Sequence, residues 1–138
     1  MTVMDHPGVV VMRAFDTRDF DLARRHLSDE SAVHETPTGE TFRGADGVIT
    51  EFKRWIGGCS DAQNNIHRVF GEGDLVVMEG VWAGTHDGDL VFPDVTLQPT
   101  GRRIEFPFAT VARAKDGIYV EGKHYYDLGT VTGQLGLA

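Results

Sequence analysis

The second half of the chain alternates between strand-like segments and turns, and this pattern restricts the fold more than any other feature. Four runs rich in Val, Ile, Phe, Tyr and Trp are predicted strands, at residues 66–70, 75–83, 104–112 and 118–126. Glycine and acidic residues follow three of them, at Gly71–Asp74, Asp87-Gly88 and Asp116-Gly117. Asp-Gly is a strong hairpin signal, because both central positions of a type I′ turn need positive φ. We therefore expect neighbouring strands to pair in the antiparallel direction.

The first third of the chain has a helical pattern. Pro7 suits the first turn of a helix that carries apolar side chains from Val9 to Phe15, because proline has no N–H to leave unpaired. Thr17 is the predicted N-cap of a short second helix. A third helix is expected at residues 45–56, where apolar side chains recur at the spacing of one helical face, and Gly57-Gly58 ends it.

Helices followed by an antiparallel meander are typical of an α+β fold. We predict a single domain over residues 1–138, in which a cone-shaped, curved antiparallel or mixed sheet wraps around the N-terminal helices. A brief strand is expected at residues 32–35, and residues 90–101, with Pro93 and Pro99, are predicted to be irregular. The open mouth of such a cone is a natural pocket for an apolar small molecule.

The charge and cysteine content of the chain limit the classes of binding partner and the cellular compartment that we expect. The formal net charge is −8, and Lys and Arg are scattered, which argues against nucleic acid and against an anionic membrane surface. No signal peptide and no membrane-length apolar run are visible, so we expect a cytoplasmic protein. Cys59 is the only cysteine, so no internal disulfide can form, and we interpret it as a packed apolar residue.

Alternation along the strands separates inward from outward side chains, because residues two apart share a face. On the last strand the inward set is predicted to be Ile118, Val120, Gly122, His124 and Tyr126. On the preceding strand it is predicted to be Ile104, Phe106, Phe108, Thr110 and Ala112. The strand at residues 75–83 is apolar on both faces, so its inner face cannot be assigned.

His124 is the leading catalytic candidate, because a histidine on an apolar face suits a general acid or base. A core histidine that only satisfies a neighbouring polar group is the alternative. His34 could lie at the pocket rim or on the surface, and His86 lies at a hairpin end, where a turn role is expected. Glu79 and Glu121 could act as a buried acid or orient a histidine, but a solvated strand residue is the commoner use of glutamate. Asp127 could cap the turn that follows it.

Several kinds of site lack the motifs they need. The sequence has no His-Glu-x-x-His pattern and no paired cysteines for a metal, and no glycine-rich phosphate loop after a strand. Ser28, Ser31 and Ser60 lack the Gly-x-Ser-x-Gly context of a hydrolase nucleophile. A cofactor-free acid–base enzyme and a binding protein remain.

Several runs distributed along the chain carry a family resemblance. They are Gly73–Val77, Trp82–Gly88, Pro99–Arg102, Tyr125–Asp127 and Gln134–Leu137, together with His34-Glu35 and Gly44. In these runs the chain resembles the SnoaL-like polyketide cyclases of the nuclear transport factor 2-like superfamily. The resemblance covers nearly the whole chain. It implies a cystatin-like α+β barrel, no metal or cofactor, and commonly a homodimer packed through the outer face of the sheet.

The resemblance also implies where the chemistry lies. Characterised cyclases of the family close a ring by intramolecular aldol condensation on an aromatic polyketide ester, with an Asp on the last strand as acid and base. That position corresponds to His124 here, and an Asn near the first short strand corresponds to His34. The polar partners on the preceding strand fall on Phe108 and Thr110. The pocket therefore resembles the family in shape and departs from it in chemistry.

We predict a cofactor-independent acid–base enzyme (a cyclase, isomerase or dehydratase) for an apolar ketone- or ester-bearing small molecule, with His124 and His34 as catalytic residues. The expected substrate-binding residues are Trp55, Met78, Trp82, His86, Phe106, Phe108, Thr110 and Tyr126. One alternative is a non-catalytic binding protein. The other is an epoxide hydrolase of the same fold, for which Arg103 and Glu105 have suitable chemistry but are predicted to lie outside the pocket.

Overall fold

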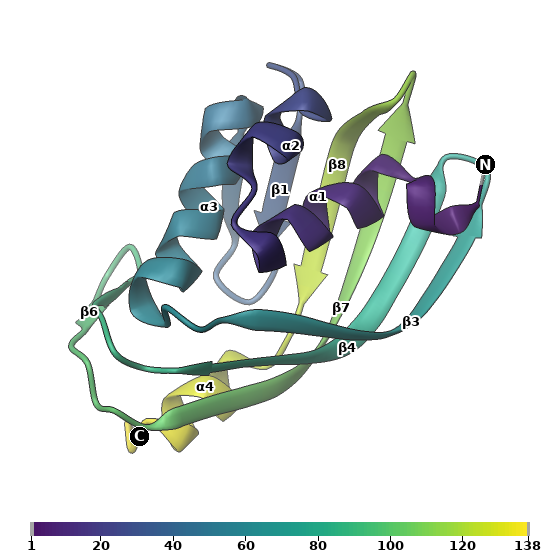
Figure 1. Ribbon diagram of the computed structural model, residues 1–138. Coiled ribbons are helices and arrows are strands. Elements are labelled where there is room, and N and C mark those ends of the chain that lie inside the picture. Colours follow the sequence, from purple (N-terminus) through teal and green to yellow (C-terminus); the bar gives the residue numbers. More distant parts are fainter. Residues whose placement is uncertain (1, 138) are drawn as a thin grey trace.

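The computed structural model describes residues 2–137 and shows a curved mixed sheet with helices α1, α2 and α3 on its concave side (Figure 1). The helices are α1 (Pro7–Thr17), α2 (Phe20–Arg25), α3 (Gly44–Gly58) and α4 (Leu128–Gln134), preceded by a 3-10 turn, η1 (Val3–Asp5). The sheet strands are β1 (Ala32–Glu35), β2 (Glu40–Arg43), β3 (Gln63–Glu72), β4 (Leu75–Thr85), β7 (Arg103–Lys115) and β8 (Ile118–Tyr125). The predicted α+β class and curved sheet are confirmed.

The strand order is β2-β1-β8-β7-β4-β3, and the sheet is open rather than closed into a barrel. Neighbouring strands pair antiparallel except β1 and β8, which run parallel. The excursion between β4 and β7 contains a separate two-stranded ribbon, β5 (Leu90–Val91) and β6 (Thr96–Leu97). The parallel pairing places a strand from the N-terminal third beside the last strand of the chain.

Local capping chemistry sets the helix boundaries. His6 caps α1, because its Nδ1 accepts the Gly8 N–H at 2.9 Å while Nε2 donates to the Asp74 carbonyl at 2.8 Å. The predicted cap of the second helix at Thr17 is wrong: Thr17 is the last residue of α1, and the Asp19 carboxylate accepts the Leu22 N–H at 3.0 Å instead.

The two Asp-Gly turns behave differently. Asp116 and Gly117 both have positive φ, 52° and 78°, and join β7 to β8 as the sequence predicts. The prediction of a hairpin at Asp87-Gly88 is wrong. The N–H groups of both residues donate to the Gly58 carbonyl at 3.1 Å, and the Asp87 carboxylate accepts the Ser60 N–H, so this segment ties the end of α3 to the sheet.

The inward faces of the long strands agree with the alternation except at one bulge. The predicted inward set of β7 is confirmed, and β4 turns Val76, Met78 and Trp82 inward. Between β7 and β8 the register shifts, so that Tyr119, which alternation places outside, is buried instead. The Tyr119 ring lies over Gly122, where an added Cβ atom would overlap the phenol oxygen.

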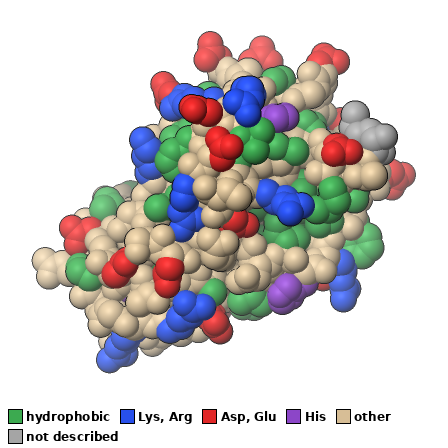
Figure 2. Space-filling view, viewed as in Figure 1, with side chains coloured by type: hydrophobic (Ala, Val, Ile, Leu, Met, Phe, Trp, Pro, Cys, Tyr) green, Lys and Arg blue, Asp and Glu red, His purple; other side chains and the backbone are tan. Residues whose placement is uncertain are grey.

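Charges of both signs are interspersed over the face of the molecule shown in Figure 2. No helix within residues 2–137 is both long enough and apolar enough to cross a membrane.

We predict that Gly122→Ala destabilises the protein by about 1–3 kcal/mol, because the added methyl group overlaps Tyr119 in a packed region. Urea unfolding measures the change. Gly133→Ala is the matched control, since no atom lies within 4 Å of its Cβ position and alanine favours the helix it belongs to. Equal stability of the two variants would contradict the packing of Tyr119 against Gly122.

Candidate functional site

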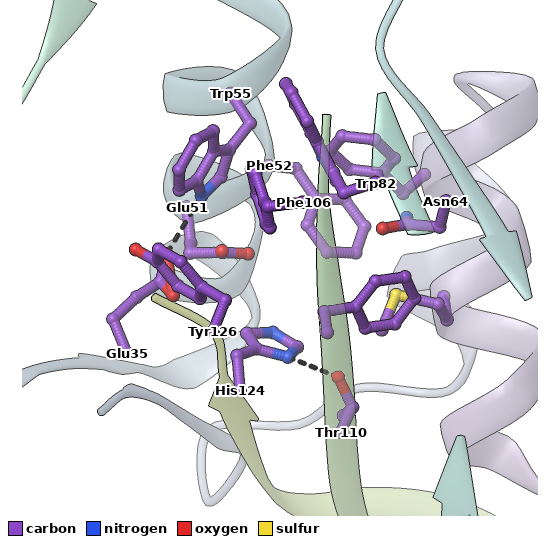
Figure 3. Close-up of a pocket in the computed structure, with 13 residues that line it drawn as sticks. Glu35, Glu51, Phe52, Trp55, Asn64, Trp82, Phe106, Thr110, His124 and Tyr126 are labelled. Carbon is purple, nitrogen blue, oxygen red and sulfur yellow. Dashed lines mark hydrogen bonds between the residues drawn. The ribbon is translucent and has the colours of Figure 1, made fainter. Parts of the chain in front are cut away.

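A cavity of ≈ 40 Å³, open at its mouth, lies between the concave face of the sheet and the helices (Figure 3). It is lined by side chains from α1, α3 and five strands or strand ends: Met12, Phe15, Glu35, Glu51, Phe52, Trp55, Asn64, Trp82, Phe106, Phe108, Thr110, His124 and Tyr126. The lining is apolar apart from a few polar groups, the composition expected of a small-molecule site.

Four aromatic rings form one wall of the cavity. Trp82 stacks on Phe106 with ring centroids 5.0 Å apart and 13° between the planes. Trp55 meets Trp82 edge-on at 5.2 Å and Tyr126 at 5.6 Å. Such rings combine a large apolar area with few rotatable bonds, so they hold a fixed shape for a flat apolar ligand.

His124 enters the cavity from β8, beside Thr110 on β7 (Figure 3). The two residues face each other across the strand pair, and Thr110 Oγ1 lies 2.7 Å from His124 Nδ1. Nε2 makes no hydrogen bond to any residue in the described range 2–137. Burial lowers the pKa of His124 from its usual 6.5 to about 4, so the imidazole is neutral at pH 7.

A pair of carboxyl groups lies at the α3 side of the cavity. Glu35 from β1 and Glu51 from α3 are 1% and 4% exposed, and their carboxyl groups lie side by side (Figure 3). The Trp55 indole N–H donates to Glu35 Oε1 at 2.8 Å. Burial raises the pKa of Glu35, and burial together with the negative charge of Glu35 raises the pKa of Glu51 well above its usual value.

The nearest cation already has a partner. The Arg54 guanidinium donates to both carboxylate oxygens of Glu40, at 2.7 and 2.6 Å. This two-pronged ion pair lowers the pKa of Glu40 and uses the geometry in which arginine binds a carboxylate best. The Glu35–Glu51 pair therefore lacks a counter-ion of its own and retains a proton more readily than exposed carboxyls do.

The Tyr126 hydroxyl is buried in the same region and has no hydrogen-bond partner within residues 2–137. Burial raises its pKa, so the phenol keeps its proton. An unpaired buried hydroxyl is costly by about 1–3 kcal/mol, so it calls for an explanation. Less than 1 Å² of the phenol oxygen is accessible, so the cavity as it stands gives a ligand no access to it.

Most of the residues predicted to bind substrate lie at the cavity. Trp55, Trp82, Phe106, Phe108, Thr110 and Tyr126 all line it, and so does His124, the predicted catalytic residue. Met78 does not: it lines a smaller neighbouring cavity that shares His124 and Thr110 with the larger one. Its placement follows from the inward face of β4, which the sequence alone left unassigned.

The predicted placements of His34 and His86 need correction. On β1 the inward residues are Val33 and Glu35, so His34 faces away from the cavity and bonds to Thr41 and Glu121. His86 is fully buried outside the cavity, where Nε2 donates to the Leu97 carbonyl at 3.0 Å. It anchors the β5–β6 ribbon, in agreement with the turn role considered for it.

Glu35 and Glu51 are the polar site residues that sequence reasoning missed. Two signals point to them. Glu35 is two residues from Val33 on a short strand, so both share a face, and Glu51 lies on the apolar face of α3, between Val48 and Trp55 at helical spacing. Both signals compete with the strong general tendency of glutamate to be solvated.

The side chains that commonly bind metals do not form a cluster in the described part of the chain. Within residues 2–137 no group of three or more His, Cys, Asp or Glu side chains is arranged to hold a metal ion. Cys59 is buried at the end of α3, and burial raises the pKa of its thiol to about 12, so it is protonated and packed rather than reactive.

The curved sheet, the helices on its concave side and the cavity between them are an α+β fold of the nuclear transport factor 2-like kind. The chain matches the SnoaL-like polyketide cyclase family over residues 9–135, and it belongs to that family. No curated protein matches it in sequence.

Solved structures of similar proteins agree with this assignment. The chain is similar to IdmH of Streptomyces antibioticus, described as "a putative polyketide cyclase", with 25% identity, a TM-score of 0.76 and coverage of 95% of this chain and 96% of that one. It shares its fold with a "putative SnoaL-like polyketide cyclase" from Jannaschia sp. CCS1 (22% identity, TM-score 0.80, coverage 96% and 93%). It also shares its fold with AclR, "a putative hydroxylase" of Streptomyces galilaeus (22% identity, TM-score 0.74, coverage 94% and 78%).

The lowered pKa of His124 predicts a specific pH dependence of stability. Between pH about 4 and 6.5 the unfolded chain binds a proton at this residue and the folded protein does not, so stability rises with pH across that window. Acidification from pH 6.5 to 4 should lower the free energy of unfolding of the native protein by on the order of 2–3 kcal/mol more than it lowers that of the His124→Gln variant. Urea unfolding at a series of pH values measures this difference.

Comparison with a variant is needed because other titratable groups make the folded protein more stable, rather than less stable, as the pH falls. Burial raises the pKa of Asp16 to about 6 and also raises that of the Glu35–Glu51 pair, which favours the folded state at low pH. His67→Gln, at an exposed histidine on β3, serves as the control and should follow the native curve. Parallel curves for native protein and His124→Gln would contradict the burial of a neutral His124.

Proposed function

We propose that this protein is a cofactor-independent acid–base enzyme that removes a proton next to the carbonyl group of an apolar ketone or ester. Such proton removal leads to ring closure, isomerisation or dehydration of the substrate. Membership of the SnoaL-like polyketide cyclase family supports the cyclase-like role. The carbonyl-bearing substrate and the reaction are our own inference from the side chains of the cavity.

The observation that carries the proposal is a neutral imidazole in an apolar cavity. His124 is fixed on one side by Thr110 and leaves Nε2 free on the cavity side. Removal of a proton from carbon creates negative charge on the carbonyl oxygen, and a low-dielectric cavity with pre-placed polar groups stabilises that charge far better than water does.

The two alternatives are less well supported. A non-catalytic binding protein has no need of a buried carboxyl pair, which destabilises the fold unless it serves a ligand. An epoxide hydrolase needs a water-activating Asp-Arg-Asp set, and Arg103 lies more than half exposed, paired with Asp61 and Glu105 outside the cavity.

Hydrogen–deuterium exchange tests the proposal without knowledge of the true substrate. Native protein in heavy water is mixed with a panel of aromatic and alicyclic ketones, and mass spectrometry follows deuterium uptake at the acidic carbon. We expect protein-dependent exchange that falls about 10²–10³-fold in His124→Ala, as when a group that stabilises the transition state is removed. His67→Ala, which changes an exposed histidine, should leave the rate unchanged.

The outcomes separate the candidate functions. Ketones that bind saturably but are recovered without deuterium would contradict the enzyme and favour the binding protein. Exchange that persists at the native rate in His124→Ala would show that His124 takes no part in the reaction.

We further propose that the protein forms a homodimer through the outer face of the sheet. That face exposes the apolar side chains of Phe70, Leu75, Val77 and Tyr125, each more than a third exposed. Sedimentation velocity should give a dimer mass, and Val77→Lys should shift the population to monomer because an ammonium group at an apolar interface costs binding energy. A native monomer at all concentrations would contradict this proposal.

A further inference from the structure

The hydrogen bond between His124 and Thr110 determines what His124 can do. Thr110 is fully buried, and its hydroxyl has no other partner within residues 2–137. If His124 Nδ1 carried a proton, the hydroxyl hydrogen of Thr110 would be left without an acceptor, which costs about 1–3 kcal/mol. The hydroxyl therefore donates to Nδ1. In a neutral imidazole the ring proton then lies on Nε2.

In this tautomer His124 presents an N–H, rather than a lone pair, to the cavity. The low pKa of the buried imidazole, about 4, also makes it a poor acceptor of a second proton. A neutral N–H donor in an apolar cavity suits a carbonyl oxygen on which negative charge develops.

A base must then come from the remaining titratable groups that line the cavity, Glu35 and Glu51. Two ionised carboxylates in contact repel each other strongly, and Arg54 is engaged by Glu40, so the pKa of both carboxyls is raised and a base formed by this pair carries at most one negative charge. The Trp55 N–H bond to Glu35 stabilises that charge. A desolvated carboxylate is a stronger base than one in water, which is why burial suits the role.

The strand register places the two functions next to each other. In the parallel pair of β1 and β8, Glu35 lies directly opposite His124, and both side chains line the cavity. Neighbouring strands are about 4.8 Å apart. A carbonyl oxygen and a hydrogen on the adjacent carbon can therefore face the two side chains at the same time (Figure 3).

On the basis of the proposed carbon-acid function, we propose that the Glu35–Glu51 pair is the catalytic base, and that His124 Nε2–H binds the enolate oxygen. The C–H bond next to the carbonyl breaks, and its proton bonds to a carboxylate oxygen of the pair. The C–H electrons form a C=C bond, and the carbonyl π electrons move to the oxygen. In ring closure the enolate carbon bonds to a second carbonyl carbon of the same molecule, whose oxygen takes the proton back from the pair.

Nitrogen NMR tests the His124 tautomer without any substrate. In uniformly nitrogen-labelled native protein at neutral pH, the His124 signals, identified by their loss in His124→Ala, should show the proton on Nε2. Thr110→Val, which removes the hydroxyl and keeps the shape, should change the balance between the two tautomers. A native spectrum with the proton on Nδ1 would overturn the donor role of His124.

Exchange rates of matched variants test the base. Glu35→Gln and Glu51→Gln keep size and hydrogen bonding but cannot accept the proton, and each should slow ketone exchange about 10²–10⁴-fold. His124→Gln keeps an N–H donor and should retain at least tenfold more activity than His124→Ala. Glu79→Gln, at an exposed carboxylate on β4, is the control and should keep the native rate. Thermal unfolding confirms that each variant is folded.

The outcomes distinguish this inference from the proposed function. If both His124 variants are equally inactive while both glutamine variants at Glu35 and Glu51 exchange at the native rate, His124 is the base: the inference is overturned and the carbon-acid function stands. If native protein exchanges no ketone, the function and the base assignment fall together, and the nitrogen spectrum alone decides the hydrogen-bond direction. If one of the two glutamine variants does not fold, the exchange rate of the other still tests the base. The ratio of the exchange rates of His124→Gln and His124→Ala still tests the donor role of His124.

Discussion

Strands β4 and β7 are hydrogen-bonded over the whole length of β4, and the position of every other element follows from this pairing. β3 and β8 add to its two sides, and β1 and β2 extend the sheet from β8. Long paired strands twist and coil, so one face becomes concave. Trp82 on β4 and Phe106 on β7 stack on that face and give the helices an aromatic surface to cover. The cavity is the part of this surface that α1 and α3 leave open.

The same apolar surroundings act in opposite directions on the two kinds of titratable group in the cavity. Burial penalises charge, so it lowers the pKa of His124 and raises the pKa of Glu35 and Glu51. The imidazole therefore loses basic strength as the carboxyl pair gains it. Groups whose pKa values are moved apart in this way can take complementary roles in one proton transfer.

Sequence patterns predicted the fold class, the inward face of β7 and the placement of His124 well, because each depends on regular alternation. They failed at Tyr119, where a bulge reverses the alternation, and they could not assign β4, whose Val77 and Val81 make the outer face apolar as well. The carboxyl pair was missed for a different reason. A buried glutamate can be predicted only when its interaction partner is known. Glu35 and Glu51 come together only through tertiary packing, which the sequence pattern does not show.

The parallel pairing of β1 with β8 has a consequence for how the protein is made. Glu35 belongs to the first third of the chain and His124 to its last strand, yet they face each other in one ladder. During synthesis the carboxyl groups exist long before the imidazole, and they remain hydrated until β8 closes the sheet beside them. Contacts between such distant segments form late in folding, since a long loop must be closed first. Chemical competence would thus arise in the last stage of folding, and an unfinished chain would carry none of it.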